Sequence, residues 1–212
     1  MRHAIILGAG GHCRTILSIL NEVKVYQFFD IVELGFPSGE TIMNVPTTAN
    51  TSIFESIETK EKIDVFLAIG DNNIRKYWWD RLKELEFSMP NLISPRAIVD
   101  PFAKLDEANV VCARAFIGPE CRIGCNNLIN TGAILEHEVS VSNHCHVGPS
   151  STIAGRSHLQ DQCFIGVGAT VINHISIASN TILGAGSVLI KSVENSNGTY
   201  VGVPAKRVLK SS

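Results

Sequence analysis

The second half of the chain groups histidines and carboxylates that could carry out general base catalysis. The polar residues of this group are Asn130, Glu136, His137, Glu138, His144, His146 and His158. A histidine near neutral pH can take a proton from an attacking amine or hydroxyl, and a neighbouring carboxylate can raise its basicity or fix its tautomer. His137 and Glu138 form such a pair, although their spacing alone favours ordinary surface residues.

A glycine-rich run near the start of the chain could bind phosphate. Gly8 to Cys13 reads Gly-Ala-Gly-Gly-His-Cys and lies between a predicted strand and a predicted helix, so its backbone N–H groups could receive a phosphate. His12 would lie at the mouth of this pocket. Asp30 would end the second strand, where an acid can accept hydrogen bonds from ribose hydroxyls. The alternative is a tight turn without a ligand.

The elements that must position these glycines form a small parallel α/β domain, predicted for residues 1–90. Short apolar runs predict strands at residues 3–7, 25–29 and 63–69. Helical spacing of apolar residues predicts helices at 11–20 and 73–85, the second with Ile74, Trp78, Leu82 and Leu85 along one side. A dehydrogenase needs two such halves, and this domain is one Rossmann-like half. A mononucleotide or nucleotide sugar is therefore favoured over NAD.

The histidine group lies in a region where every sixth residue is aliphatic. The series is Val99, Leu105, Val111, Ile117, Ile123, Ile129, Leu135, Val141, Val147, Ile153, Leu159, Ile165, Val171, Ile177, Leu183 and Leu189. Three such steps close a triangular coil of 18 residues, with glycines after several aliphatics as turn residues. The pattern predicts a left-handed parallel β-helix over residues 91–192, followed by a C-terminal tail, 193–212.

Two consequences follow for the cysteines and for metal binding. Cys145 and Cys163 are one coil apart, so they should stack inside the prism as free thiols rather than form a disulfide. His144 and His146, with His137 or His158, could instead ligate a metal, as in the γ-type carbonic anhydrases. Because corner and face positions aim these side chains differently, we expect no metal.

Several motifs together resemble a known family. They are Gly8–His12, residues 68–75 (Ala-Ile-Gly-Asp-Asn-Asn-Ile-Arg), residues 130–138 (Asn-Thr-Gly-Ala-Ile-Leu-Glu-His-Glu), His146, residues 154–155, residues 164–168 and residues 201–207. In this order they resemble the bacterial sugar N- and O-acetyltransferases, the hexapeptide-repeat proteins of the PglD and NeuD type. The resemblance covers nearly the whole chain.

The resemblance implies a homotrimer that binds acetyl-CoA in the groove between neighbouring prisms and a nucleotide-linked amino sugar on the N-terminal domain. It places the catalytic base on His137 and its acidic partner on Glu138. The implied substrate-binding residues are Gly10, Gly11, His12, Asp30, Gly70 and Asn130. The implied acetyl-CoA residues are His146, Gly155, Val167 and Ala185. Relatives often have a second acid where this chain has Ile31, and often have glycine in place of Ala185.

The expected activity is therefore direct transfer of acetyl from acetyl-CoA to the amine of UDP-4-amino-4,6-dideoxy-N-acetylglucosamine. The alternatives are N-acetylation of a dTDP- or GDP-linked 4-amino sugar, O-acetylation of a sialic acid, a metal-dependent β-helix enzyme, and a non-catalytic nucleotide-sugar-binding protein. A net charge of −2 argues against nucleic acid as a partner. With no apolar run of the roughly 18 residues that a membrane span needs and no signal peptide, we expect a cytoplasmic protein.

Overall fold

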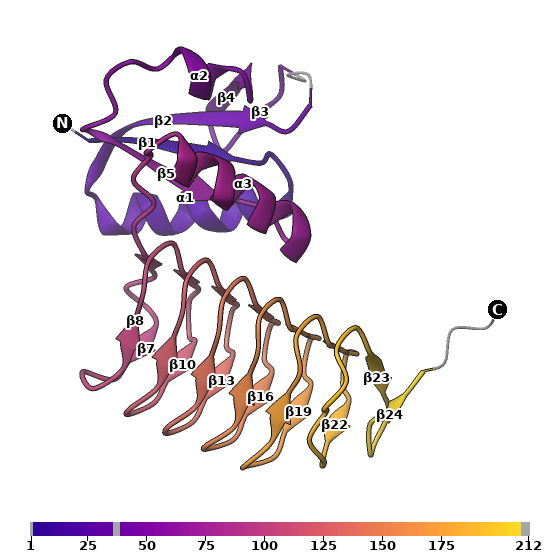
Figure 1. The fold of residues 1–212 in the computed structure, drawn as a ribbon. Helices are drawn as coiled ribbons and strands as arrows, with labels where there is room; N and C mark the ends of the chain where they lie inside the picture. The colour runs from indigo at the N-terminus through magenta and orange to yellow at the C-terminus, as the bar shows by residue number, and fades with distance from the viewer. Residues whose placement is uncertain (1, 36–38, 209–212) are drawn as a thin grey trace. The chain divides into compact units, whose positions relative to one another are not determined.

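The computed structural model describes residues 2–35 and 39–208 and divides the chain into two compact units, Met1–Pro95 and Arg96–Ser212. The first unit has a five-stranded sheet in the order β3-β4-β2-β1-β5 (Figure 1). Its strands are β1 (Arg2–Leu7), β2 (Tyr26–Glu33), β3 (Thr41–Ile42), β4 (Val45–Asn50) and β5 (Ile63–Leu67). Its helices are α1 (Gly11–Val23), α2 (Ile53–Ser56) and α3 (Asn72–Glu84), and β6 (Leu92–Ile93) follows them. This confirms the predicted α/β fold.

The second strand is longer than predicted. Strand β2 continues past Asp30 because Ile31 and Val32 are buried and pair in parallel with Ile6 and Leu7 of β1. Asp30 therefore lies inside the strand and does not end it. Strands β3 and β4 were not predicted. They form an antiparallel hairpin that carries Pro46 and several polar residues, so its sequence does not resemble an apolar strand.

Helix α3 was predicted to within one residue at each end, and its predicted buried side is confirmed in part. Leu82 is buried as predicted, and Trp78 and Leu85 are half-buried, but Ile74 is exposed and Arg75 is buried instead. Arg75 can be buried because its guanidinium donates to the carbonyl oxygens of Ile69 and Gly70, at 3.1 and 3.3 Å. The arginine thereby ties the start of α3 to the segment that follows β5.

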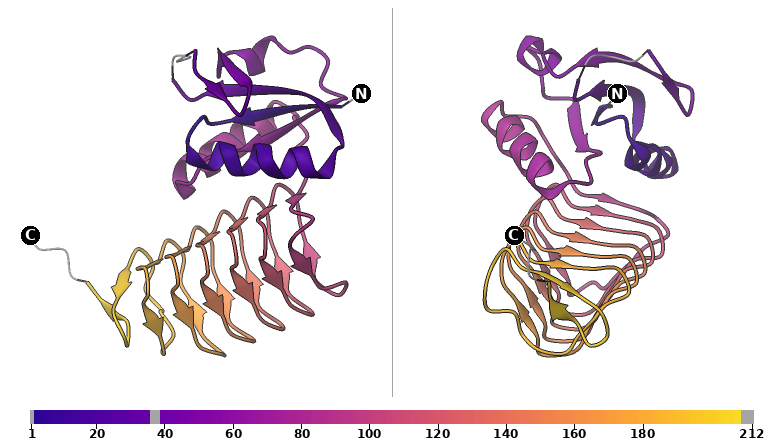
Figure 2. Two further views of the ribbon diagram at one scale, coloured as in Figure 1. Left: turned by 180° about the vertical axis from the view of Figure 1, so that it is seen from behind. Right: turned by 90° about the vertical axis from the view of Figure 1, so that its right-hand side faces the viewer.

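The second unit is the predicted left-handed parallel β-helix, in which each strand pairs with the one 18 residues further along the chain, as in Phe116 with Ile134 (Figure 2). One sheet contains β7 (Ile98–Val99), β10 (Phe116–Ile117), β13 (Ile134–Leu135), β16 (Thr152–Ile153), β19 (Thr170–Val171) and β22 (Val188–Leu189). The next contains β8 (Lys104–Leu105), β11 (Arg122–Ile123), β14 (Ser140–Val141), β17 (His158–Leu159) and β20 (Ser176–Ile177).

The third sheet contains β9 (Val110–Val111), β12 (Leu128–Ile129), β15 (His146–Val147), β18 (Phe164–Ile165) and β21 (Ile182–Leu183). It continues into the predicted tail with β23 (Thr199–Val201) and the antiparallel β24 (Lys206–Arg207). Residues 209–212 of that tail lie outside the described residues. We call these three the first, second and third sheets, and the chain passes through them in that order in every coil.

The six-residue repeat fills the prism interior as predicted. From Val111 to Leu189 every aliphatic of the series is buried, and Cys145 and Cys163 are buried as free thiols. The glycines that follow the aliphatics, however, are not the turn residues. A left-handed backbone recurs every six residues, for example at Glu138 (φ 59°) and Arg156 (φ 59°), three positions after each aliphatic.

The glycines after the aliphatics are small for another reason, which is close approach to the next coil. A Cβ added at Gly148 would lie 2.5 Å from the carbonyl oxygen of Ile165. The 18-residue spacing places each such glycine directly against the following coil, so its role is steric rather than conformational. Among the described residues, no helix is both long and apolar enough to cross a membrane.

Candidate active site

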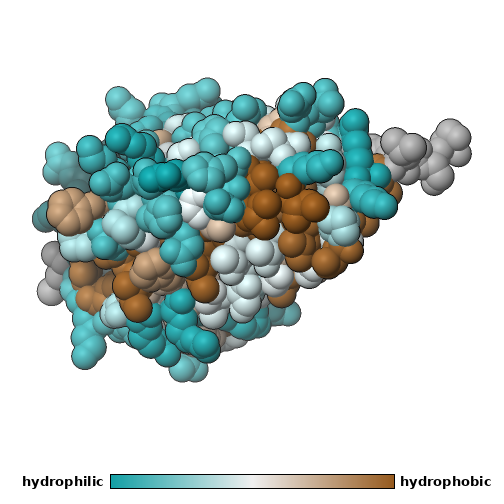
Figure 3. All heavy atoms as spheres, turned by 90° about the horizontal axis from the view of Figure 1, so that it is seen from below, coloured by the Kyte–Doolittle hydropathy of each residue, from teal (hydrophilic) through white to brown (hydrophobic). Residues whose placement is uncertain are grey.

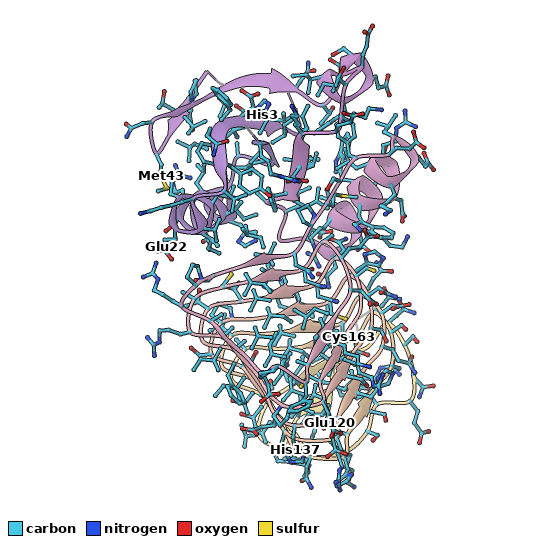
Figure 4. All side chains as sticks on the ribbon, turned by 90° about the vertical axis from the view of Figure 1, so that its left-hand side faces the viewer. His3, Glu22, Met43, Glu120, His137 and Cys163 are labelled. Carbon is cyan, nitrogen blue, oxygen red and sulfur yellow. The ribbon has the colours of Figure 1, made fainter. Side chains whose placement is uncertain are left out.

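His137 and Glu138 lie together at the corner where the chain passes from the first sheet to the second. His137 comes two residues after the buried Leu135 of β13, and both side chains are partly exposed, 53% for His137 and 38% for Glu138. The Nδ1 atom of His137 lies 3.0 Å from Oε2 of Glu138. Figure 4 shows His137 at this corner, close to Glu120 and pointing away from the prism interior.

Arg156 completes this corner from the following coil. Its Nε donates to the same Oε2 atom of Glu138 at 2.8 Å. The Arg156 hydrogen bond, followed by the one from His137, holds the pKa of the Glu138 carboxyl below its usual value. Glu138 is thus ionised and can act as an acceptor for both neighbours.

The ionised carboxylate determines which nitrogen of His137 can accept a proton. A carboxylate has no hydrogen to donate, so Nδ1 of His137 must be the donor in their hydrogen bond. The lone pair of the neutral ring is then on Nε2. In this arrangement Glu138 fixes the tautomer of His137, and Nε2 is the nitrogen that can accept a proton.

Gly155 forms the surface on which the His137 ring lies. A Cβ added at Gly155 would be 2.5 Å from both Cε1 and Nε2 of His137. Gly155 is itself buried, and the 18-residue period places it directly after His137 in the stack of coils. The absence of a side chain at Gly155 is therefore what permits the observed position of the ring.

The other residues predicted to bind acetyl-CoA, His146, Val167 and Ala185, lie away from this corner, and so does Asn130, which was predicted to bind the substrate. Asn130, Val167 and Ala185 lie where the chain passes from the third sheet to the first, and His146 lies on β15 of the third sheet. Asn130 Nδ2 is 3.2 Å from Nε2 of His146, whose ring packs edge-on against Phe164 with 4.9 Å between centroids. Within one chain, these residues are separated from His137 by the width of the first sheet.

Apolar side chains are also exposed along this part of the prism. Val167 is 56% exposed and Ile182 is 44% exposed, and Figure 3 shows apolar side chains gathered in patches between polar ones. Val167 and Ala185 occupy equivalent positions one coil apart, since the N–H of Gly186 donates to the carbonyl of Val167. Together they form a small apolar ridge at the edge of the prism.

A shallow hollow of about 530 Å³ opens beside Glu138. Its lining residues are Phe102, Lys104, Glu120, Cys121, Arg122, Glu138 and Ser140. It lies against the outward face of the second sheet and mixes acids with two cations. A ligand that carries both an amine and negatively charged groups would find complementary partners there.

In the first unit, the predicted glycines lie where the carboxyl ends of β1 and β5 meet. Gly8 has a φ of 111°, and a Cβ there would be 2.8 Å from the carbonyl oxygen of Ala68, so this position requires glycine. By contrast, a Cβ at Gly10, Gly11 or Gly70 would meet nothing within 4 Å. Open space therefore lies next to the backbone at the start of α1, where N–H groups can bind a phosphate.

The two remaining substrate-binding predictions differ in their surroundings. His12 is half-buried in the first turn of α1. Asp30 pairs with Ile5 in the parallel ladder, and its Oδ2 is 2.8 Å from Nε2 of His3. The sequence indicated neither this ion pair nor the distance of Asp30 from the end of its strand.

Arg156 is the functional candidate that the sequence analysis missed. The signal that would have found it is the 18-residue period, because Arg156 is 18 positions after Glu138. The period also explains why His137, His144, His146 and His158 do not converge. In the described part of the chain, no three histidine, cysteine or acidic side chains are grouped so that they could hold a metal ion.

Comparison with known proteins gives one family and several similar structures. Residues 3–82 match the family model described as the PglD N-terminal domain. GDP-perosamine N-acetyltransferase from Caulobacter crescentus, solved as a histidine variant with CoA and GDP-perosamine, is 30% identical with a TM-score of 0.93, and the match covers 99% of this chain and 98% of that one.

Two further structures are similar over nearly the whole chain. The acetyltransferase domain of PglB from Neisseria gonorrhoeae FA1090, solved with acetyl coenzyme A, is 26% identical with a TM-score of 0.91, covering 98% of this chain and 99% of that one. WeeI from Acinetobacter baumannii AYE is 19% identical and shares the fold, with a TM-score of 0.89 and coverage of 98% and 100%. No curated protein matches the chain.

Proposed function

The chain belongs to the PglD-like family of sugar acetyltransferases, and from this we propose that it transfers an acetyl group from acetyl-CoA to the amine of a nucleotide-linked amino sugar. The observation that carries the proposal is the His137–Glu138 pair at 3.0 Å on an open corner of the prism. An amine must lose a proton as it attacks a carbonyl carbon, so the reaction needs a base of this kind. We propose a cytoplasmic location for this reaction.

In the proposed mechanism, His137 takes the proton of the attacking amine on Nε2. Acetyl-CoA supplies the acetyl group as a thioester, so a C–N bond forms, a C–S bond breaks, and the proton on His137 goes to the departing sulfur. Glu138 stabilises the imidazolium that His137 becomes. A covalent acetyl-enzyme is not needed, and the buried Cys145 and Cys163 are poorly placed to form one.

We assign acetyl-CoA to the ridge of Val167 and Ala185 and to His146 beside it, with Gly155 contributing from the His137 corner of the neighbouring copy. The ridge is open and apolar, and Gly168 and Gly186 beside it have left-handed backbones without side chains. These features suit a long, thin ligand that runs along a corner. Asn130 is assigned to the acceptor side, as the family resemblance implies, and its amide 3.2 Å from the His146 ring would place the acceptor next to acetyl-CoA.

The separation of the two corners supports a homotrimer. His137 is at the corner between the first and second sheets, whereas Val167 and Ala185 are at the corner between the third and first. In a ring of three prisms, the base of one copy could meet the acetyl-CoA ridge of its neighbour. Light scattering coupled to size-exclusion chromatography would give a mass near 69 kDa, three times the 23.0 kDa of the chain, whereas a monomer that keeps full activity would contradict this assignment.

The nucleotide sugar is assigned to the first unit, with its phosphates against the N–H groups at the start of α1. Gly10, Gly11 and Gly70 leave open space there, and His12 and Asp30 are the proposed side-chain contacts. Our first candidate is UDP-4-amino-4,6-dideoxy-N-acetylglucosamine. GDP-perosamine is the second candidate, because the 30% identical Caulobacter enzyme was solved with that ligand.

A substrate panel tests the proposal and separates its candidates. Steady-state kinetics would use acetyl-CoA with UDP-, dTDP- and GDP-linked 4-amino sugars, and a sialic acid would serve as the hydroxyl acceptor. Release of CoA with one of the nucleotide-linked amines is expected. Turnover of the sialic acid alone would replace N-acetylation by O-acetylation, and turnover with none of them would contradict the proposed function.

A further inference from the structure

The His137–Glu138 pair is held from outside by a residue with no assigned role, Arg156. Its Nε donates to Glu138 Oε2 at 2.8 Å, the same oxygen that lies 3.0 Å from Nδ1 of His137. Its backbone N–H also donates to the carbonyl oxygen of His137, at 3.1 Å. Arg156 therefore contacts both members of the pair from the following coil.

The shared oxygen limits how far the arginine can be from the base. Since both bonds end on Oε2, Arg156 Nε lies within about 5.8 Å of His137 Nδ1. The cation, the carboxylate and the ring therefore meet at Oε2, and the position of the Glu138 carboxylate depends on both of its neighbours.

Several other charged and titratable groups surround this corner. They are Glu120 on the preceding coil, Glu136 and Glu138 on the same coil, His174 two coils later, and Lys104 and Arg122 in the hollow beside Glu138. Glu138 is the acid that contacts the ring, and Arg156 is the cation that hydrogen-bonds directly to Glu138. Arg156 should therefore position Glu138 more than the other cations do.

We propose that Arg156 is a positioning residue of the acetyl transfer: it holds the Glu138 carboxylate against Nδ1 of His137, so that Nε2 is the nitrogen that accepts a proton. This inference rests on the proposed role of His137 as base. Loss of the arginine leaves Glu138 free to turn away from the ring, so the tautomer of the base is no longer fixed.

The test compares Arg156→Ala and Arg156→Lys with Arg114→Ala. Arg114 is a matched control, because it is an exposed arginine with the same left-handed backbone (φ 61°) at another corner of the prism. For Arg156→Ala we expect kcat to fall about tenfold, the lower range for loss of a group that orients a histidine. The KM values of acetyl-CoA and of the amino sugar should stay the same.

The split between kcat and KM separates positioning from a merely structural effect, because a general loss of structure would change both. Arg156→Lys keeps a cation that can donate to Glu138 and should restore part of kcat. In a Glu138→Ala background, Arg156→Ala should add no further loss, because the arginine acts through Glu138.

Two results would overturn the inference. One is an unchanged kcat in Arg156→Ala, and the other is an equal loss in Arg114→Ala. Measuring His137→Ala in parallel tests the proposed function separately from the role of Arg156. If His137→Ala is inactive while Arg156→Ala is normal, the role of Arg156 is wrong and the base stands. If His137→Ala retains turnover, the base itself is wrong and the inference fails with it.

Discussion

Gly155→Ala is the substitution for which the structure makes the sharpest prediction. The added Cβ would lie 2.5 Å from Cε1 and Nε2 of His137 and 3.0 Å from Nδ1. Carbon atoms in ordinary contact are about 3.5 to 4.0 Å apart. The ring must therefore move by about 1 Å, and a displacement of that size costs about 100-fold in rate when a catalytic group depends on its position.

The fold should tolerate the same substitution. The atoms in conflict belong to a half-exposed side chain that can rotate away, and the backbone of Gly155 is not left-handed. We expect the free energy of unfolding to change by less than about 1 kcal/mol, as is usual where a surface side chain can adjust. A large loss of kcat without a loss of stability would distinguish a displaced His137 ring from a destabilised fold.

The assay is CoA release at saturating acetyl-CoA and acceptor, with calorimetry for acetyl-CoA binding. Gly155→Ala is also made in a His137→Ala background. If Gly155 acts by seating the ring, the second substitution should cost nothing once the ring is gone. The reasoning is refuted by an unchanged kcat, by an equal loss in both backgrounds, or by an effect confined to the KM of acetyl-CoA.

Three further predictions follow from the other sites. His137→Ala should lose at least about 100-fold in kcat but still bind acetyl-CoA by calorimetry, and near-normal turnover would exclude it as the base. Asp30→Ala should raise the acceptor KM with little change in the KM of acetyl-CoA. As a control, His3→Ala breaks the same contact but keeps the carboxylate, so it should leave the acceptor KM unchanged. An unchanged acceptor KM in Asp30→Ala would refute the role of Asp30. Burial raises the pKa of Cys112 to about 12 and that of Cys13 to about 11. At pH 8, both thiols should therefore react with iodoacetamide far more slowly in the folded protein than in urea, as measured by mass spectrometry. Equal rates would contradict their burial.

The β-helix was predictable because one spacing determines its whole structure. A six-residue period defines sheets, coils and interior at once, so residues as far apart as Val111 and Leu189 obey the same rule. The position of His137 at a corner followed from this period. The structure of the turns did not, because glycine suggested a left-handed backbone where the actual requirement was space against the next coil.

The α/β unit shows where local patterns are insufficient. Burial of Ile31 and Val32 extends β2 beyond Asp30, and that burial comes from pairing with β1, which a local pattern does not reveal. Arg75 is buried because carbonyl groups outside the helix receive its hydrogen bonds. In both cases a tertiary partner overrides the local preference.

The candidate site combines both kinds of information. The period alone places Gly155 and Arg156 one coil after His137 and Glu138, but it does not say that a ring lies on the glycine or that an arginine reaches the carboxylate. Those contacts depend on side-chain direction at a left-handed corner, where Glu138 and Arg156 share one backbone conformation and therefore project alike. Left-handed corners stack equivalent side chains in adjacent coils, and at the corner of Glu138 and Arg156 this stacking places an arginine beside the carboxylate that contacts His137.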